Sequence, residues 1–143
     1  MRSIDLSRKL DATPTPQNDA RKFLYLLLTY HIARNSRASH IQIDTQNRTL
    51  LGQLRPPTGQ NLVTVISAPD AKFLFNVIVS IIVRAAGLLP DSTSISQYDQ
   101  ARVIKFYAKT QNELVLFESQ ISMPKTKIPQ VTFKIESETT LAP

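Results

Sequence analysis

The sequence of 143 residues contains no cysteine and no tryptophan, and it has only three glycines and two histidines. The lack of cysteine excludes a disulfide framework and any thiolate metal site. Three isolated glycines cannot form the glycine-rich loops that bind phosphates in nucleotide-binding proteins. The remaining residues suggest neither a nucleophilic triad nor a pair of buried carboxylates. The chain is therefore not predicted to be an enzyme, and no cofactor is predicted.

The two histidines, His31 and His40, are the only nitrogen ligands that a metal site could use in a chain without cysteine. Metal sites need several donors close together, and the sequence places no third ligand beside these two. We therefore interpret His31 as a residue on a helix face and His40 as a residue at a strand edge. No metal is predicted.

Positive charge exceeds negative charge, with 17 lysines and arginines against 11 acidic residues and a net charge of +6. Such an excess is compatible with an acidic partner, a phosphate ligand or a membrane surface. Aromatic residues are only 7% of the chain and stand mostly in apolar positions, so stacking platforms for nucleic acid are not evident. The basic residues that could form a nucleic-acid patch are Arg34, Arg37, Arg48, Arg55 and Lys105.

Hydrophobic periodicity predicts a helix over about 19–35, with Asn18 as its N-cap, and a second helix between Pro69 and Gly87. Alternation of apolar and polar residues predicts six strands. The order α-β-β-β-α-β-β-β predicts an α+β fold, in which two helices cover one face of a mostly antiparallel sheet. The predicted strands are 40–44, 49–55, 62–66, 102–107, 114–121 and 130–135, with a polar connector over 89–100.

Both ends of the chain are polar. Residues 1–18 include two prolines and are predicted to be a flexible tail, and residues 137–143 are predicted to be a second one. Residues 19–136 then form a single domain. The first ten residues carry four charges and no apolar core, so no secretory signal is predicted. The apolar segments are too short for a transmembrane helix, and we expect a cytoplasmic protein.

The second helix is apolar around most of its circumference. Its polar residues recur every four positions and form one narrow stripe of Lys72, Asn76, Ser80 and Arg84. A sheet and one other helix cover only part of such a surface, so the rest is predicted to contact a partner. The row of Leu74, Ile78 and Ile82 is assigned to the core or to this face. The predicted interface residues are Phe73, Val77, Ile81 and Val83.

Four short motifs occur in a specific order along the domain. The predicted first helix contains Leu27–Ile32 and is followed by Ala38–Ile43. The predicted second helix ends with Ala86–Leu88, and the next predicted strand is preceded by a motif that spans Gln97–Val103. In this order and spacing, over about 19–136, the chain resembles the second N-terminal domain of type II secretion and type IV pilus assembly ATPases. The resemblance implies a PAS-like domain, in which arginines contact phosphates bound in the motor domain. The matching positions are Arg55 and Arg102.

The sequence also departs from that family. His40 and Gln42 stand where the family has aspartate and histidine, and Gln53 replaces the first arginine of the strand. No G-x-x-x-x-G-K-S/T motif occurs, so the motor itself is missing. The chain is therefore either an excised N-terminal domain or a diverged stand-alone relative of it.

The leading hypothesis is a bacterial, non-catalytic interaction or regulatory domain. It would dock on a secretion or pilus ATPase, or on an inner-membrane platform protein, in the cytoplasm or at the periphery of the inner membrane. A second copy of the chain, bound through the second helix, is a further candidate partner. Two alternatives stay open: a PAS-like small-molecule sensor with its ligand between sheet and helix, and a basic nucleic-acid-binding module.

Overall fold

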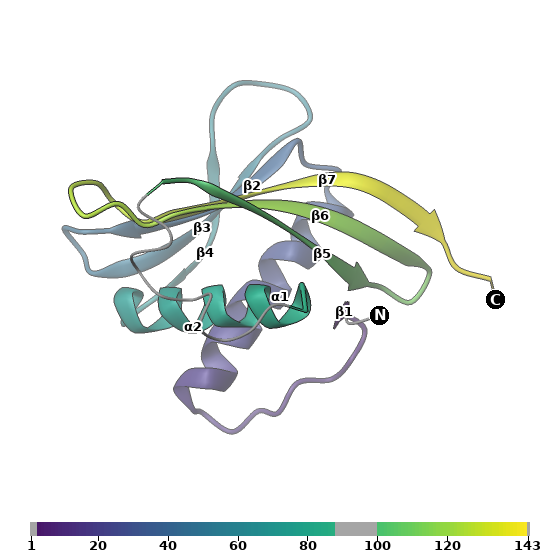
Figure 1. Ribbon diagram of the computed structural model, residues 1–143, viewed down its shortest axis with the longest axis horizontal. Helices are drawn as coiled ribbons and strands as arrows, with labels where there is room; N and C mark the ends of the chain where they lie inside the picture. Colours follow the sequence, from purple (N-terminus) through teal and green to yellow (C-terminus); the bar gives the residue numbers. More distant parts are fainter. Residues whose placement is uncertain (1–2, 88–99, 143) are drawn as a thin grey trace.

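The computed structural model describes residues 3–87 and 100–142 (Figure 1). The fold is α+β, as predicted, and the predicted order α-β-β-β-α-β-β-β is confirmed, with one further strand in front of it. The predicted connector lies outside the described residues except for Gln100. The elements are β1 (Ser3–Asp5), α1 (Pro16–Ala33), β2 (Ala38–Asp44), β3 (Thr49–Arg55), β4 (Val63–Ala68), α2 (Ala71–Ala85), β5 (Arg102–Lys109), β6 (Glu113–Ser122) and β7 (Gln130–Thr140).

The strands form one sheet in the order β1-β5-β6-β7-β2-β3-β4. It consists of two antiparallel three-stranded units, β2-β3-β4 and β5-β6-β7, each preceded in the chain by a helix. The first strand of one unit pairs with the last strand of the other, with Ser39 opposite Phe133. Because β1 pairs in parallel with β5, it extends the sheet at one edge, while β4 forms the other edge.

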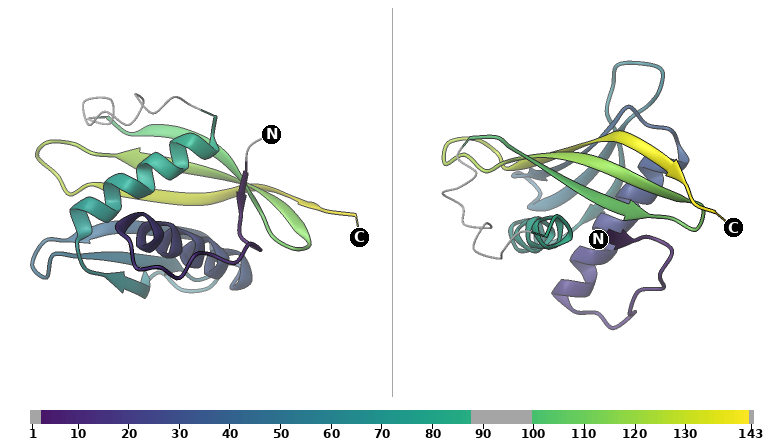
Figure 2. Two further views of the ribbon diagram at one scale, coloured as in Figure 1. Left: turned by 90° about the horizontal axis from the view of Figure 1, so that it is seen from below. Right: turned by 45° about the vertical axis from the view of Figure 1, so that its right-hand side comes forward.

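Both helices lie on the same face of the sheet and contact each other (Figure 2). Their apolar stripes are buried against the inward-facing residues of the strands, which alternate with outward-facing ones. The row of Leu74, Ile78 and Ile82 on α2 belongs to this core. The largest fully buried side chains are Phe75, Phe106, Phe117, Phe133, Leu24, Leu27, Leu28, Ile41, Leu50, Ile78 and Ile82.

One polar pair lies inside this apolar layer. His31 of α1 and Ser39 of β2 are both fully buried, and His31 Nδ1 lies 2.8 Å from Ser39 Oγ. The imidazole packs edge-on against Phe117, with ring centroids 5.3 Å apart. Burial away from water lowers the pKa of His31 to about 4, because the charged form loses its hydration.

The opposite face of the sheet carries polar side chains. Gln42 Nε2 donates to Gln53 Oε1 over 3.2 Å, and Gln53 Nε2 donates to Thr64 Oγ1 over 3.1 Å. Farther along the same face, Lys105 forms an ion pair of 3.0 Å with Glu136. These cross-strand contacts join β2, β3 and β4 on one side and β5 and β7 on the other.

The start of α1 differs from the prediction. The helix begins at Pro16, before the predicted N-cap Asn18, and Thr15 is the N-cap. Thr15 Oγ1 accepts a hydrogen bond of 3.1 Å from the backbone N–H of Asn18. A proline is tolerated at the first helical position, where its missing N–H would have no partner in the helix.

The structure also moves both predicted tail boundaries. Ser3–Asp5 forms a strand against β5, with Ile4 only 3% exposed, so part of 1–18 belongs to the sheet and core. At the other end, β7 continues to Thr140 because β6 pairs with it that far, with Glu113 opposite Thr140. The domain is therefore longer at both ends than 19–136.

Gly52 of β3 lets α1 approach the sheet closely. A Cβ atom at this position would lie 3.2 Å from Phe23 and 3.3 Å from Leu27, closer than side chains normally pack. We expect Gly52→Val to lower the free energy of unfolding by about 1–3 kcal/mol through overpacking. Leu51→Val, on the open face of the same strand, is the control and should cost less than about 1.5 kcal/mol. Urea denaturation followed by circular dichroism measures both, and equal losses would contradict this account.

Candidate functional site

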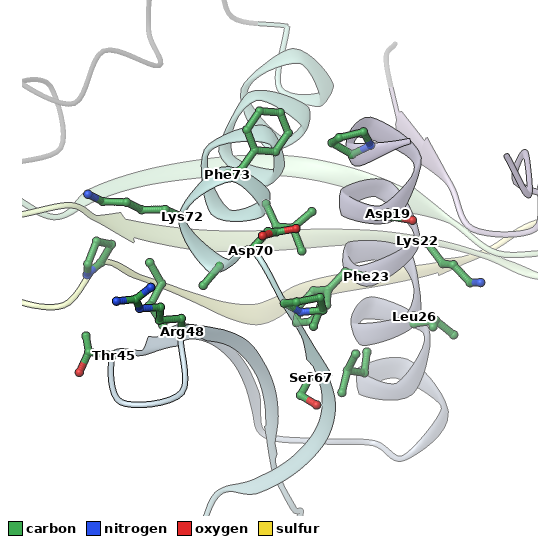
Figure 3. Close-up of a pocket in the computed structure, with 18 residues that line it drawn as sticks. Asp19, Lys22, Phe23, Leu26, Thr45, Arg48, Ser67, Asp70, Lys72 and Phe73 are labelled. Carbon is green, nitrogen blue, oxygen red and sulfur yellow. The ribbon is translucent and has the colours of Figure 1, made fainter. Parts of the chain in front are cut away.

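An open groove of about 1120 Å³ lies where both helices begin. One side is formed by the first half of α1, and another by β4 and the start of α2 (Figure 3). The turn between β2 and β3, with Thr45 and Arg48, and the residue Pro129 just before β7 complete the lining. Four stretches that are far apart in the sequence, 16–26, 43–48, 66–74 and 129, therefore meet at this groove.

Apolar side chains line much of the groove. Phe23 is buried and points from α1 toward the sheet, where its ring packs at Gly52 of β3, whereas Leu26 is 37% exposed (Figure 3). Phe73 is 48% exposed and projects from the first turn of α2. Exposed large apolar side chains beside a concave surface are typical of sites that bind a partner or a ligand.

The charged residues of the groove are three cations and two acids. Lys22, Arg48 and Lys72 line it together with Asp19 and Asp70. Within residues 3–87 and 100–142, no ion pair joins any of these five side chains to another group. Their charges are therefore available to a bound molecule, and the cations outnumber the acids.

The starts of the two helices contribute differently to this positive potential. Asp19 lies in the first turn of α1, where a carboxylate offsets the positive end of the helix. At α2 the N-cap residue Asp70 adopts a left-handed conformation with φ 59° and ψ 45°, and its side chain caps no backbone N–H. The first N–H groups of α2 at the groove are therefore not satisfied by their own cap.

The predicted interface residues of α2 divide into two groups. Phe73 is exposed at the groove, and Val77 and Ile81 are partly buried and continue its row along the helix. Val83 is fully buried in the core, so its assignment to an interface is wrong. The error arose because Val83 lies on the buried side of α2, which helical periodicity alone could not distinguish in a nearly all-apolar helix.

The two predicted phosphate-binding arginines do not lie together. Arg55 ends β3 and Arg102 begins β5, with β2, β7 and β6 between them. Four strand spacings separate them by roughly 19 Å across the sheet. Arg55 Nη1 donates to the carbonyl of Gln60 over 2.9 Å, and neither arginine lines the groove.

Most of the candidate nucleic-acid residues contact groups of their own chain. Arg37 donates to the carbonyls of Pro56 and Gly59. Arg34 lies 4.8 Å from the ring centroid of Tyr30, and Lys105 is paired with Glu136. Of the five basic residues, only Arg48 lines the groove.

The histidines lie on opposite faces of the sheet. His31 is buried beneath it, whereas His40 is half-buried on the open face, where burial lowers its pKa. Among the described residues, no three side chains of histidine, cysteine, aspartate or glutamate gather closely enough to hold a metal ion.

No protein-family model matches the chain, and no curated protein matches it significantly. In the described part of the chain, neither helix combines the length and hydropathy needed to cross a bilayer. The groove must therefore be interpreted from its own residues. Sequence reasoning found Phe73, named Arg48 only as a candidate nucleic-acid residue, and missed Leu26 and Lys22. Nothing in a linear pattern places a turn of one hairpin beside two helix starts.

Proposed function

We propose that this chain is a non-catalytic interaction domain and that a partner protein docks in the groove. The observation that carries this proposal is the groove of about 1120 Å³, in which Leu26 and Phe73 expose 37% and 48% of their surface. Burying such side chains against a partner is favourable by about 25 cal/mol per Å² of apolar area.

The proposed partner is a secretion or pilus ATPase, or an inner-membrane platform protein, and the proposed location is the cytoplasm or the inner-membrane periphery. The ordered motifs Leu27–Ile32 and Ala38–Ile43 support this choice through their resemblance to an ATPase N-terminal domain. Arg55 and Arg102 stay candidates for phosphate contacts made in the presence of a separate motor. The groove lies apart from both and is the surface that we assign to docking.

Binding measurements with two variants test this function. We expect the chain to bind the purified ATPase motor or the cytoplasmic part of the platform protein from the same genome. Phe73→Asp should weaken binding by at least about tenfold, because it places a charge in an apolar contact. The control is Val103→Asp, since Val103 is 55% exposed on β5 but does not line the groove. Isothermal titration calorimetry gives the affinities, and no binding to either partner, or equal loss in both variants, would disprove the proposal.

The same groove also favours a second candidate, a small-molecule sensor. Its volume of about 1120 Å³ is slightly above the roughly 300–1,000 Å³ that is usual for ligand pockets, and its lining mixes apolar and charged side chains. A thermal-shift screen of nucleotides and common metabolites distinguishes the two. A ligand at a hundredfold excess over its dissociation constant stabilises the protein by about 2.7 kcal/mol, so a binder raises the melting temperature clearly.

A further inference from the structure

The groove borders an unpaired edge of the sheet. Strand β4 is the last strand of the sheet, and among the described residues its backbone pairs only with β3. Every second N–H and C=O group of such a strand points away from its neighbour. These groups are available to the backbone of another chain.

The two edges of the sheet are protected differently. At one edge β1 has only three residues, and the neighbouring β5 carries Arg102, Lys105 and Lys109. Short strands and charged side chains are the usual protection against unwanted strand pairing. At the other edge β4 has six residues, Val63–Ala68, and contains neither a charge nor a proline. The β4 edge therefore lacks the chemical protection that the opposite edge has.

A bulge determines which part of β4 can accept another strand. The pairing with β3 shifts register between Gly52 and Gln53, which leaves Val65 without an opposite residue. Beyond the bulge Ile66–Ala68 is in regular register, and these three residues all line the groove. The accessible stretch of the edge and the groove therefore coincide.

Helix α1 provides the second side of a channel along this stretch. Figure 3 shows α1 beside β4, with Lys22 and Leu26 of α1 on the lining of the groove. In an extended chain, alternate side chains point to opposite faces of the sheet. A strand paired with Ile66–Ala68 would direct every second side chain toward the apolar groups of α1. An edge strand flanked by a helix is a known arrangement for binding extended peptides.

Charge indicates the chemistry of the occupant. Arg48 and Lys72 lie on one side of β4 and Lys22 on the other, and none has an ion-pair partner in the described ranges. The whole chain carries a net charge of +6. Asp19 and Asp70 also line the groove, so the cations exceed the acids by one. An extended segment with acidic side chains complements this excess better than a basic one does.

We propose that Ile66–Ala68 of β4 pairs with an extended acidic segment of the partner protein, which extends the seven-stranded sheet by one strand. This inference rests on the proposed function, because it specifies how the partner docks in the groove. Backbone hydrogen bonds to β4 supply affinity, the channel beside the exposed Leu26 selects apolar side chains, and Lys22, Arg48 and Lys72 select acidic ones.

Backbone-methylated peptides test the pairing without altering the protein. The probe is a fluorescein-labelled peptide of alternating glutamate and valine. Two further versions of this peptide carry N-methyl groups on alternate residues. In one version the methyl groups lie along one edge of the extended peptide, and in the other version they lie along the opposite edge. We expect the parent peptide to bind and only one methylated version to lose affinity, by about tenfold or more, since methylation removes the donors of one edge only. Fluorescence anisotropy measures all three. No binding of the parent peptide, or equal affinity of all three, overturns the inference.

Charge variants form the second arm of the test. Arg48→Glu and Lys72→Glu should each weaken the parent peptide by about tenfold, and a lysine-valine peptide should not bind the native protein. Lys134→Glu is the matched control, because Lys134 is exposed next to the buried Phe133 and therefore faces away from the helices. Equal effects of all three variants, or tighter binding of the basic peptide, would contradict the choice of an acidic segment.

The outcomes separate this inference from the proposed function. If Phe73→Asp abolishes binding of the partner while both methylated peptides bind like the parent, then the groove is a docking site but strand addition is wrong. If the partner binds Phe73→Asp as well as the native chain, the proposed function itself fails. Protection of the Ile66–Ala68 amides from hydrogen exchange in the partner complex would support both.

Discussion

Phe117→Ala is expected to lower the free energy of unfolding by about 3–5 kcal/mol, more than any other single change considered for this protein. Phe117 of β6 is fully buried in the core. Its ring stacks on Phe106 at 5.6 Å and lies edge-on to Phe133 at 6.4 Å and to His31 at 5.3 Å. The truncation removes these contacts and leaves a cavity between helices and sheet.

Guanidinium denaturation followed by circular dichroism measures this loss. Small domains have a total stability of about 5–15 kcal/mol, so the variant is expected to stay folded but close to its limit. Phe117→Leu retains most of the volume and should cost clearly less, which keeps the experiment informative if the alanine variant unfolds. Val103→Ala on an exposed site is the control. A loss below about 1 kcal/mol for Phe117→Ala would show that the ring does not occupy the core as described.

The stability of the native protein is expected to fall by about 3 kcal/mol as the pH decreases from 6.5 to 4, because of His31. Burial lowers the pKa of His31 to about 4 in the folded state, whereas the unfolded chain has the usual value of 6.5. Between these values the unfolded chain binds a proton that the folded protein excludes, so acid favours unfolding. Well above pH 6.5 both states are neutral and this histidine contributes no pH dependence.

Two variants separate this contribution from the other titrating groups. His31→Gln should flatten the stability profile between pH 6.5 and 4, whatever its own stability at pH 7. His40→Gln is the matched control and should retain most of the slope, although burial lowers the pKa of His40 as well. Three aspartates, Asp5, Asp11 and Asp44, have pKa values that are lowered in the folded protein. They therefore reduce the stability of the fold only in a lower pH range, as the pH falls through their usual pKa of 3.8 and below. An unchanged slope in His31→Gln would contradict the prediction.

Periodicity was sufficient to predict the helices and the antiparallel strands. The hairpin of β2 and β3 was recognisable because apolar residues alternate on both sides of a polar turn. The second helix was bounded by proline and glycine, and its stripe of Lys72, Asn76, Ser80 and Arg84 faces outward. These features depend only on local sequence, which is why the fold class and the element order were correct.

The elements that were missed depend on distant partners. Ser3–Asp5 contains a single apolar residue and becomes a strand only because β5 offers it an edge. The end of β7 has exposed side chains throughout, and its strand conformation follows from pairing with the start of β6. The groove was unpredictable for the same reason, since Arg48, Leu26 and Pro129 meet only after the sheet has closed.

The pairing of β2 with β7 at the middle of the sheet has a consequence for synthesis on the ribosome. The chain emerges from the ribosome with its N-terminal end first, so β2, β3 and β4 are available long before β7. Among the described strands, the two three-stranded units are joined only by the pairing of β7 with β2. Nascent chains that stop short of β7 leave both β2 and β6 with unsatisfied inner edges in the centre of the protein. Because the decisive contacts join distant parts of the sequence, completion of the sheet is a late step and a slow one.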